Sequence, residues 1–179
     1  PPLGEVIVCD GVYIESLDFH GKELLVRSRL GAEATLIQSS DTTRPLTFSS
    51  GETRQSIVDG FTIIGGGIRF GGAIHISGNS SPVIRNSIIT DANVFDLYAE
   101  AHGGAIWING GSPLFENNLV ANNRVESQCC DSFGGAVYLC QSDAVFIDVK
   151  FRENVAGNYG GALYIGGNSS PTFISSAFL

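Results

Sequence analysis

The feature that most constrains this chain is a six-residue motif that occurs four times. Each copy begins Gly-Gly-Ala, continues with an aliphatic residue, and then has a ring-bearing residue before a second aliphatic residue. The copies occupy residues 71–76, 103–108, 134–139 and 160–165, so their starting positions differ by 32, 31 and 26 residues. Periods of this length are typical of repeat proteins, in which each unit buries its apolar face against its neighbours.

A second set of landmarks follows each copy at a nearly constant distance. A Ser-Pro or Asp-Ala pair comes first, then an Asn, Asp or Ser, and then an apolar residue three positions later. Short segments between the landmarks alternate apolar and polar residues, which indicates strands with one buried face. The pattern predicts an all-β fold, a right-handed parallel β-helix of about six to seven coils. The residues expected to point inward are Phe48, Ile74, Ile84, Ile106, Phe115, Val137, Phe146, Leu163 and Phe173.

One column of polar residues is expected to mark a corner of each coil. It contains Asn86, Asn117, Asp148 and Ser175, which follow the Ser-Pro or Asp-Ala pair at the same offset. Asn and Gly tolerate the positive φ angles that tight corners need. Two interpretations stay open: a hydrogen-bonded side-chain ladder along the column, or independent turn residues.

The charge composition limits the classes of partner that the chain is expected to bind. The 179 residues carry 10 basic and 18 acidic side chains, a net charge of −8. Nucleic acids and anionic membranes are bound through basic patches, so neither is expected as a partner. No apolar run approaches the roughly 18–20 residues that span a bilayer, so we expect no membrane insertion by this segment.

Residues 1–179 are expected to form a single β-helix domain that is a segment of a longer chain. The sequence has no initiator Met and stops within an apolar run at Phe178 and Leu179. Terminal coils of a solenoid need caps, so such ends favour end-to-end self-association or further coils.

The four cysteines do not follow a metal-binding spacing. Cys129 and Cys130 are adjacent, while Cys9 and Cys140 stand apart. A disulfide from Cys129 or Cys130 to Cys140 and four free thiols both remain open.

Two groups of residues resemble known families. The Gly-Gly-Ala copies, together with residues 151–156 before the last copy, resemble polymorphic outer-membrane protein repeats. Residues 11–15, 21–22 and 59–63 resemble segments of pectin lyase-like right-handed β-helix proteins. The resemblance implies the β-helix fold but little about function, because this superfamily holds lyases, hydrolases, adhesins and inert spacers. The paired Asp, Gly-His-Gly and Arg-Ile-Lys motifs of polygalacturonase-type hydrolases do not occur here.

The first candidate site is an outward column of rings. His75, Trp107, Tyr138 and Tyr164 share one position in the four copies, and Ser49 is expected to precede them one coil earlier. Adjacent coils lie about 4.8 Å apart, so four rings would form a strip on one face. Aromatic strips bind sugars, which makes these four residues the candidate ligand-binding set for a polysaccharide or surface glycan. The alternative is that outward rings only stabilise the sheet.

The second candidate site is a pair of longer connections, residues 92–102 and 123–133, which should lie side by side. Long loops on a rigid scaffold commonly carry function. Three uses stay open: catalysis, calcium binding, and a solvated acidic rim without a ligand. The candidate catalytic residues are Asp91, Glu100, His102, Arg124 and Asp131. The candidate calcium ligands are Asp96, Glu100, Glu126 and Asp131.

Three functions therefore remain open. The first is a non-catalytic secreted or surface β-helix module that binds glycan or another surface. The second is a polysaccharide lyase or hydrolase, and the third is a purely structural solenoid segment. Each of them predicts an extracellular, periplasmic or cell-surface location. No cofactor is expected, with calcium in the loops as the one alternative.

Overall fold

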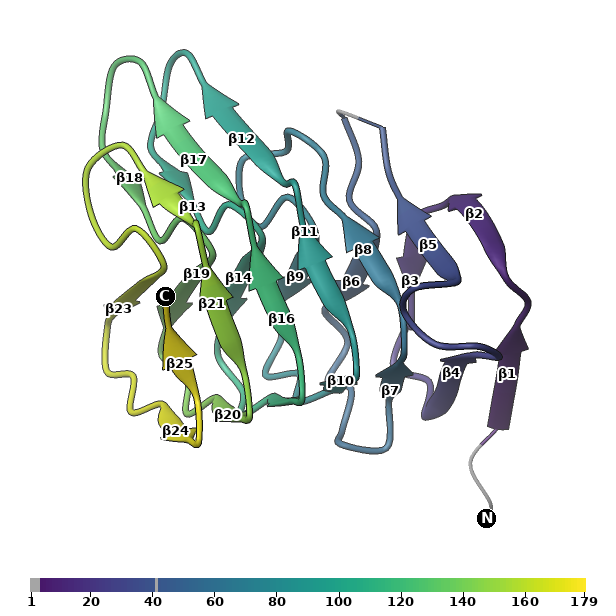
Figure 1. The fold of residues 1–179 in the computed structure, drawn as a ribbon. Coiled ribbons are helices and arrows are strands. Elements are labelled where there is room, and N and C mark those ends of the chain that lie inside the picture. Colours follow the sequence, from purple (N-terminus) through teal and green to yellow (C-terminus); the bar gives the residue numbers. More distant parts are fainter. Residues whose placement is uncertain (1–3, 41) are drawn as a thin grey trace.

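The structure is a computed structural model that describes residues 4–40 and 42–179. The described chain is all-β, and its strands wind into a right-handed parallel β-helix whose two ends carry the two termini (Figure 1). Two sheets have seven strands each and a third has six, which corresponds to six to seven coils. Every strand pairs in parallel with strands of adjacent coils. The fold expected from the repeat is confirmed.

Three long sheets form the walls of the helix. The first sheet contains β1 (Gly4–Val8), β4 (Leu24–Ser28), β7 (Ile57–Asp59), β10 (Val83–Arg85), β15 (Leu114–Glu116), β20 (Val145–Ile147) and β24 (Thr172–Ile174). The second contains β2 (Gly11–Ile14), β5 (Thr35–Gln38), β8 (Thr62–Ile64), β11 (Ile88–Thr90), β16 (Leu119–Ala121), β21 (Lys150–Arg152) and β25 (Ala177–Phe178). The third contains β3 (Leu17–Asp18), β6 (Leu46–Phe48), β9 (Ile74–Ile76), β14 (Ile106–Asn109), β19 (Val137–Cys140) and β23 (Leu163–Gly166).

Two short sheets lie between the second and third sheets. Four of their strands come from the connections that the sequence marks as long, and β22 comes from the shorter connection that follows. β12 and β17 extend their coils beyond β11 and β16 (Figure 1). One short sheet contains β12 (Asn93–Asp96), β17 (Arg124–Ser127) and β22 (Val155–Ala156). The other contains β13 (Ala101–His102) and β18 (Ser132–Phe133).

The core runs along the axis of the helix in columns of like residues. In the first sheet, Phe146 is fully buried and stacks between Phe115 and Phe173, with ring centroids 5.0 and 4.9 Å apart. In the third sheet, Ile74 and Ile106 are both fully buried and pair in register. The residues expected to point inward do so, and those of the last coil are only partly covered.

The register of an early coil differs from the expectation. Thr47, rather than Ser49, pairs with His75, and Leu46 pairs with Ile74. Ser49 lies beyond the end of β6. The assignment was wrong by two residues, because a shift of two leaves the inward and outward faces of a strand unchanged and alternation therefore cannot detect it.

Asn86 and Asn117 of the polar corner column form a hydrogen-bonded ladder, as one of the two interpretations predicted, whereas no side-chain hydrogen bond among the described residues joins Asp148 or Ser175 to it. Asn86 and Asn117 both have φ of 51°. The Asn117 side-chain amide donates to the side-chain oxygen Oδ1 of Asn86 over 2.8 Å, and the Asn86 side-chain amide donates to the Asp59 carboxylate over 2.7 Å. The ladder thus reaches one coil earlier than expected, because Asp59 on β7 supplies the acceptor.

The Gly-Gly doublets are required by close approach between coils. Gly134 has φ of 67°, which favours glycine. A Cβ atom on Gly135 would lie 1.9 Å from the backbone oxygen of Gly161 in the next coil. The second glycine of the doublet therefore lets the backbones of neighbouring coils touch.

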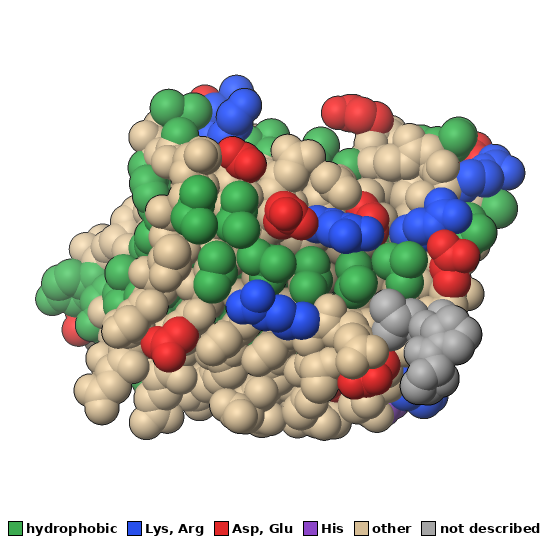
Figure 2. Space-filling view, turned by 90° about the horizontal axis from the view of Figure 1, so that it is seen from below, with side chains coloured by type: hydrophobic (Ala, Val, Ile, Leu, Met, Phe, Trp, Pro, Cys, Tyr) green, Lys and Arg blue, Asp and Glu red, His purple; other side chains and the backbone are tan. Residues whose placement is uncertain are grey.

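The outer face of the first sheet carries charges in register (Figure 2). Arg27, Asp59, Arg85 and Glu116 occupy one row across four strands. The Arg85 guanidinium lies 2.9 Å from the Asp59 carboxylate, and Arg27 lies 2.6 Å from Glu5. A parallel row of apolar side chains runs beside these charges. Opposite charges on neighbouring coils offset one another on this face.

Candidate functional site: a double ladder of aromatic side chains

The outward column expected from the motif forms on the third sheet. Parallel pairing places Trp107 between His75 and Tyr138, and it places Tyr138 beside Tyr164. All four side chains are half-buried. They share one face because they occupy the same alternating position in β9, β14, β19 and β23.

A second column of rings lies beside the first. It is made of the residue directly before each Gly-Gly doublet: Phe70, His102, Phe133 and Tyr159. Parallel bridges join these residues from coil to coil. The signal was present in the sequence, since a ring precedes all four doublets, but the sequence patterns alone left Phe70, Phe133 and Tyr159 unassigned. We refer to the two columns together as the double aromatic ladder.

The two columns interleave. The first three rings of the second column each pack against the ring of the first column that belongs to the next coil, and Tyr159 stacks on Phe133. The ring centroids are 5.6 Å apart for Phe70 and Trp107, 4.4 Å for His102 and Tyr138, and 4.8 Å for Phe133 and Tyr164. The double aromatic ladder is therefore a packed cluster rather than an open strip.

Within the first column the rings stack in two pairs. His75 and Trp107 stack at 4.5 Å, and Tyr138 and Tyr164 stack at 5.4 Å. Sugars pack their C–H faces on the flat faces of aromatic rings. Here those faces contact other rings of the ladder, so a ligand that runs along the helix axis meets ring edges and hydroxyl groups.

In the His75 and Trp107 pair, two ring nitrogen atoms are buried. His75 Nδ1 and Trp107 Nε1 are both buried and have no hydrogen-bond partner among the described residues. Burial, together with the charge of the nearby Arg44 guanidinium, lowers the pKa of His75 to about 4. Burial also lowers the pKa of Arg44 to about 10, and its guanidinium donates to the backbone carbonyl of Phe70. These features are those of a packed interior rather than of a solvated binding face.

Around Tyr138 the ladder is more polar. His102 Nε2 lies 3.2 Å from the Glu100 carboxylate. Burial lowers the pKa of His102, while the hydrogen bond and charge of Glu100 act in the opposite direction. Burial raises the pKa of Tyr138, and the charges of Cys140, Tyr164 and Glu100 add to that effect. Glu100 has 58% of its side chain exposed, so it forms the solvent-exposed edge of the cluster around Tyr138.

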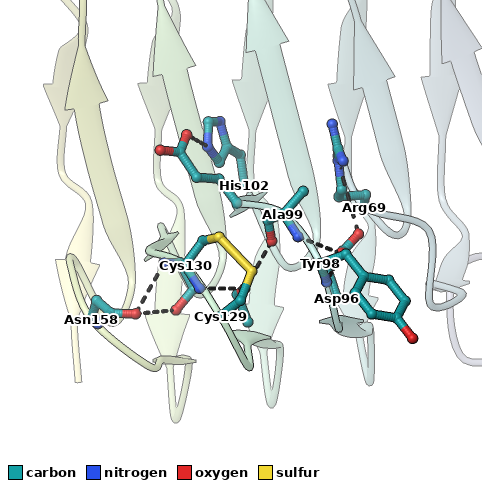
Figure 3. Close-up of a disulfide and its surroundings, with 11 residues drawn as sticks. Arg69, Asp96, Tyr98, Ala99, His102, Cys129, Cys130 and Asn158 are labelled. Carbon is teal, nitrogen blue, oxygen red and sulfur yellow. Dashed lines mark hydrogen bonds and ion pairs between the residues drawn. A yellow bond between two sulfur atoms is a disulfide. The ribbon is translucent and has the colours of Figure 1, made fainter.

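The two long connections lie side by side, as expected. β12 pairs with β17, and β13 pairs with β18. The turn after β12 is held by Asp96, whose carboxylate accepts hydrogen bonds from the backbone amides of Tyr98 and Ala99, each over 2.9 Å. The Arg69 guanidinium approaches the same carboxylate at 3.9 Å (Figure 3). Asp96 therefore serves the local turn.

The other candidate carboxylates contact nearby side chains. Asp91 accepts a hydrogen bond from the Thr90 hydroxyl over 3.0 Å, Glu126 pairs with Arg124, and Asp131 is half-buried before β18. Within residues 4–40 and 42–179, no three His, Cys, Asp or Glu side chains are grouped closely enough to hold a metal ion. Asp91, Asp96, Glu100 and Glu126 thus make separate local contacts rather than one shared site.

The cysteines differ from both alternatives. Cys129 and Cys130 form a disulfide with each other at the turn between β17 and β18 (Figure 3). Cys140 is free at the end of β19, and Cys9 is free and exposed. A bridge to Cys140 was wrong, because Cys140 belongs to the third sheet whereas the adjacent pair occupies the tip of an inserted loop.

Comparison with known proteins gives one short match. The family model of the Chlamydia polymorphic membrane protein (Chlamydia_PMP) repeat matches residues 148–166, which contain β21, β22, β23 and the whole of the last motif copy. No curated protein and no solved structure matches the chain. The matched repeat and the stacked coils identify the chain as a β-helix repeat protein. Across the described residues, no helix is long and apolar enough to cross a membrane.

Proposed function

We propose that this chain is a non-catalytic β-helix module that works at a cell surface, where it holds its loops and faces in a fixed arrangement. The observation that carries the proposal is the match of residues 148–166 to a repeat of polymorphic membrane proteins, within coils that repeat the same motif. The likeness to the pectin lyase-like superfamily is an analogy of fold and carries no argument about function. The local pairing of the loop carboxylates favours a scaffold over a lyase or hydrolase.

Surface exposure can be tested on the full-length protein in intact cells of its source organism. Antibodies against this segment should label intact cells, and added protease should remove the epitope without lysing them. A cytoplasmic protein that stays intact in the same sample is the control. If the epitope becomes accessible only after lysis, the surface proposal is wrong.

A second candidate function is glycan binding at the Tyr138 end of the double aromatic ladder. The specific observation that favours it is that the hydroxyl groups of Tyr138 and Tyr164 have no hydrogen-bond partner among the described residues, although both rings are half-buried. Glu100 lies at the edge of the same group. Sugar hydroxyls would bond to these groups while a sugar ring contacts the exposed edges. Trp107 and His75 would act mainly as support, because their faces are covered.

The glycan proposal is tested by a glycan array followed by titration. Tyr138→Phe and Tyr164→Phe keep the stacked rings and remove only the hydroxyl groups, so we expect each to weaken binding by about 3–10-fold, the scale of a hydrogen bond. Tyr98→Phe is the matched control, because its ring is 86% exposed on a neighbouring loop outside the ladder. If no glycan binds, or if all three variants bind equally, the ladder serves only the structure of the solenoid.

A further inference from the structure

The disulfide between Cys129 and Cys130 occupies the exposed tip of the second inserted loop. Both residues are exposed, and the four-residue turn that contains them joins β17 to β18. The pair lies outside the double aromatic ladder, and the proposed surface module does not use it. Its chemistry therefore calls for a separate explanation.

The neighbouring coil shows that this turn forms without a disulfide. Pairing of Asp96 with Ser127 and of Ala101 with Ser132 leaves four residues in each turn, so Tyr98 and Ala99 correspond to Cys129 and Cys130. The first turn is closed by hydrogen bonds to a side chain of its own strand. The same backbone path is thus available to a chain with no sulfur atoms.

The second turn has its own hydrogen bonds that do not involve sulfur. Ser127 Oγ donates to the Ala99 carbonyl over 2.8 Å and accepts from the Cys130 amide over 3.2 Å. Beyond the disulfide, the Ser132 amide and hydroxyl both donate to Asn158 Oδ1, over 3.0 and 2.9 Å (Figure 3). These bonds tie the turn to both neighbouring coils through atoms other than sulfur.

The disulfide also constrains the unfolded chain very little. Stabilisation by a disulfide grows with the length of the loop that it closes, and adjacent cysteines close the shortest loop there is. Exposed disulfides are the ones that react with thiols in solution. Structural support is therefore a poor explanation of this pair, and reversible reactivity is a better one.

We propose that Cys129 and Cys130 form a redox modification site that exchanges with small-molecule thiols while the solenoid stays folded. A thiolate attacks one sulfur atom, a mixed disulfide forms, and the other cysteine leaves as a thiolate that takes up a proton. A second thiol attacks the mixed disulfide and releases the first cysteine. The protein gains two electrons and two protons, and two thiol molecules are oxidised to one disulfide.

The reaction is tested on the folded chain with dithiothreitol and with buffers of reduced and oxidised glutathione, followed by maleimide labelling and peptide mass spectrometry. The peptide that contains Cys129 and Cys130 should carry no label before reduction and two labels afterwards. Its labelled fraction should follow the glutathione ratio in both directions. Cys9, which is free and exposed, should label equally in both states and serves as the internal control.

Folding is monitored in the same samples. The β-sheet circular dichroism signal should be unchanged, and Tm should shift by less than about 2 °C on reduction, which corresponds to less than about 1 kcal/mol in a domain of this size. The double substitution Cys129→Ser with Cys130→Ser should melt at the same temperature in both buffers. Labelling without reductant, labelling only in denaturant, or loss of the sheet signal on reduction would each overturn the proposal.

Discussion

The first sheet and the double aromatic ladder both place rings in register, yet they use them differently. Inside the first sheet, Phe115, Phe146 and Phe173 stack as identical residues in successive coils. On the outside of the third sheet, the column changes from His75 to Trp107 and then to tyrosine. The inner column excludes water from the axis of the helix, whereas the outer column is covered only partly and by a second set of rings.

This difference shows how strongly burial restricts a repeat. A fully buried position must stay apolar and fit its neighbours, because a cavity or a clash is transmitted to both of them. Its volume can still change gradually, since the same inner column runs from Val58 to Ile84 to Phe115, all fully buried. A half-buried position needs only a flat ring that its neighbours can contact. Variation in the outer column is therefore compatible with the same backbone and does not by itself indicate a ligand.

The largest effect should come from the inner column. We expect Phe146→Ala to lower the free energy of unfolding by about 3–5 kcal/mol, because the ring is fully buried and contacts rings on both sides. Trp107→Ala should lower it by only about 1–2 kcal/mol, since its ring is half-buried and loses the contacts with His75 and Phe70. Chemical denaturation of both variants measures the contrast. Equal losses would show that the outer ladder is as much a core as the inner column.

A smaller effect should come from the contact between coils at the Gly-Gly doublet. Gly135→Ala places a Cβ atom 1.9 Å from the Gly161 carbonyl oxygen, so the two coils must separate, at about 2–3 kcal/mol. Gly161→Ala is the matched control at the same motif position, where the nearest atom, the Asn154 carbonyl oxygen, is 3.2 Å away. Thermal unfolding compares the two variants. An equal loss in both would mean that close approach between coils does not explain the need for glycine at this position of the doublet.

The smallest effect is the loss of folding stability at low pH that comes from His75 in the double aromatic ladder. The pKa of His75 is about 4 in the folded chain, below its value of about 6.5 when unfolded, so the folded state favours the neutral ring. The contribution of His75 to the stability of the folded state is fully present above pH 6.5 and is lost as the pH falls from about 6.5 to 4. We expect a loss of about 1–2 kcal/mol after allowing for the partial exposure of the ring.

The variant His75→Phe keeps the stack with Trp107 and removes the titrating group. Its stability, measured by denaturation between pH 7 and 4, should fall less steeply than that of the unchanged chain. A residual slope should remain, because burial lowers the pKa of His102 as well. Identical slopes in the two proteins would contradict the assignment of the transition to His75.

Much of the fold could be predicted from the residues themselves. The motif spacing gave the parallel pairing of Ile74 with Ile106, and alternation gave the inward direction of Phe115 and Phe146. The corner column was recognisable because Asn tolerates the φ of 51° that Asn86 and Asn117 adopt. These features follow from local stereochemistry and a repeated period, both of which can be seen in a single sequence.

The candidate site was predictable only in part. The positions of His75, Trp107, Tyr138 and Tyr164 on one face followed from the motif, but their coverage by the rings before the Gly-Gly doublets did not. The error at Ser49 has the same origin as this omission. Both concern which residue of one coil meets which residue of the next, and alternation is blind to a shift of two residues.

By itself, the sequence determined that the chain stacks in coils, which residues face inward, and where the corners turn. Only the tertiary structure decided that the outer rings interleave, that Cys129 bonds to Cys130 and not to Cys140, and that Asp96 holds a turn. The physical reason is how far apart in the sequence the interacting residues of each feature lie. Strand direction and corner geometry depend on neighbouring residues, whereas ring coverage depends on contacts between residues about one coil apart, whose geometry exists only after the coils have stacked.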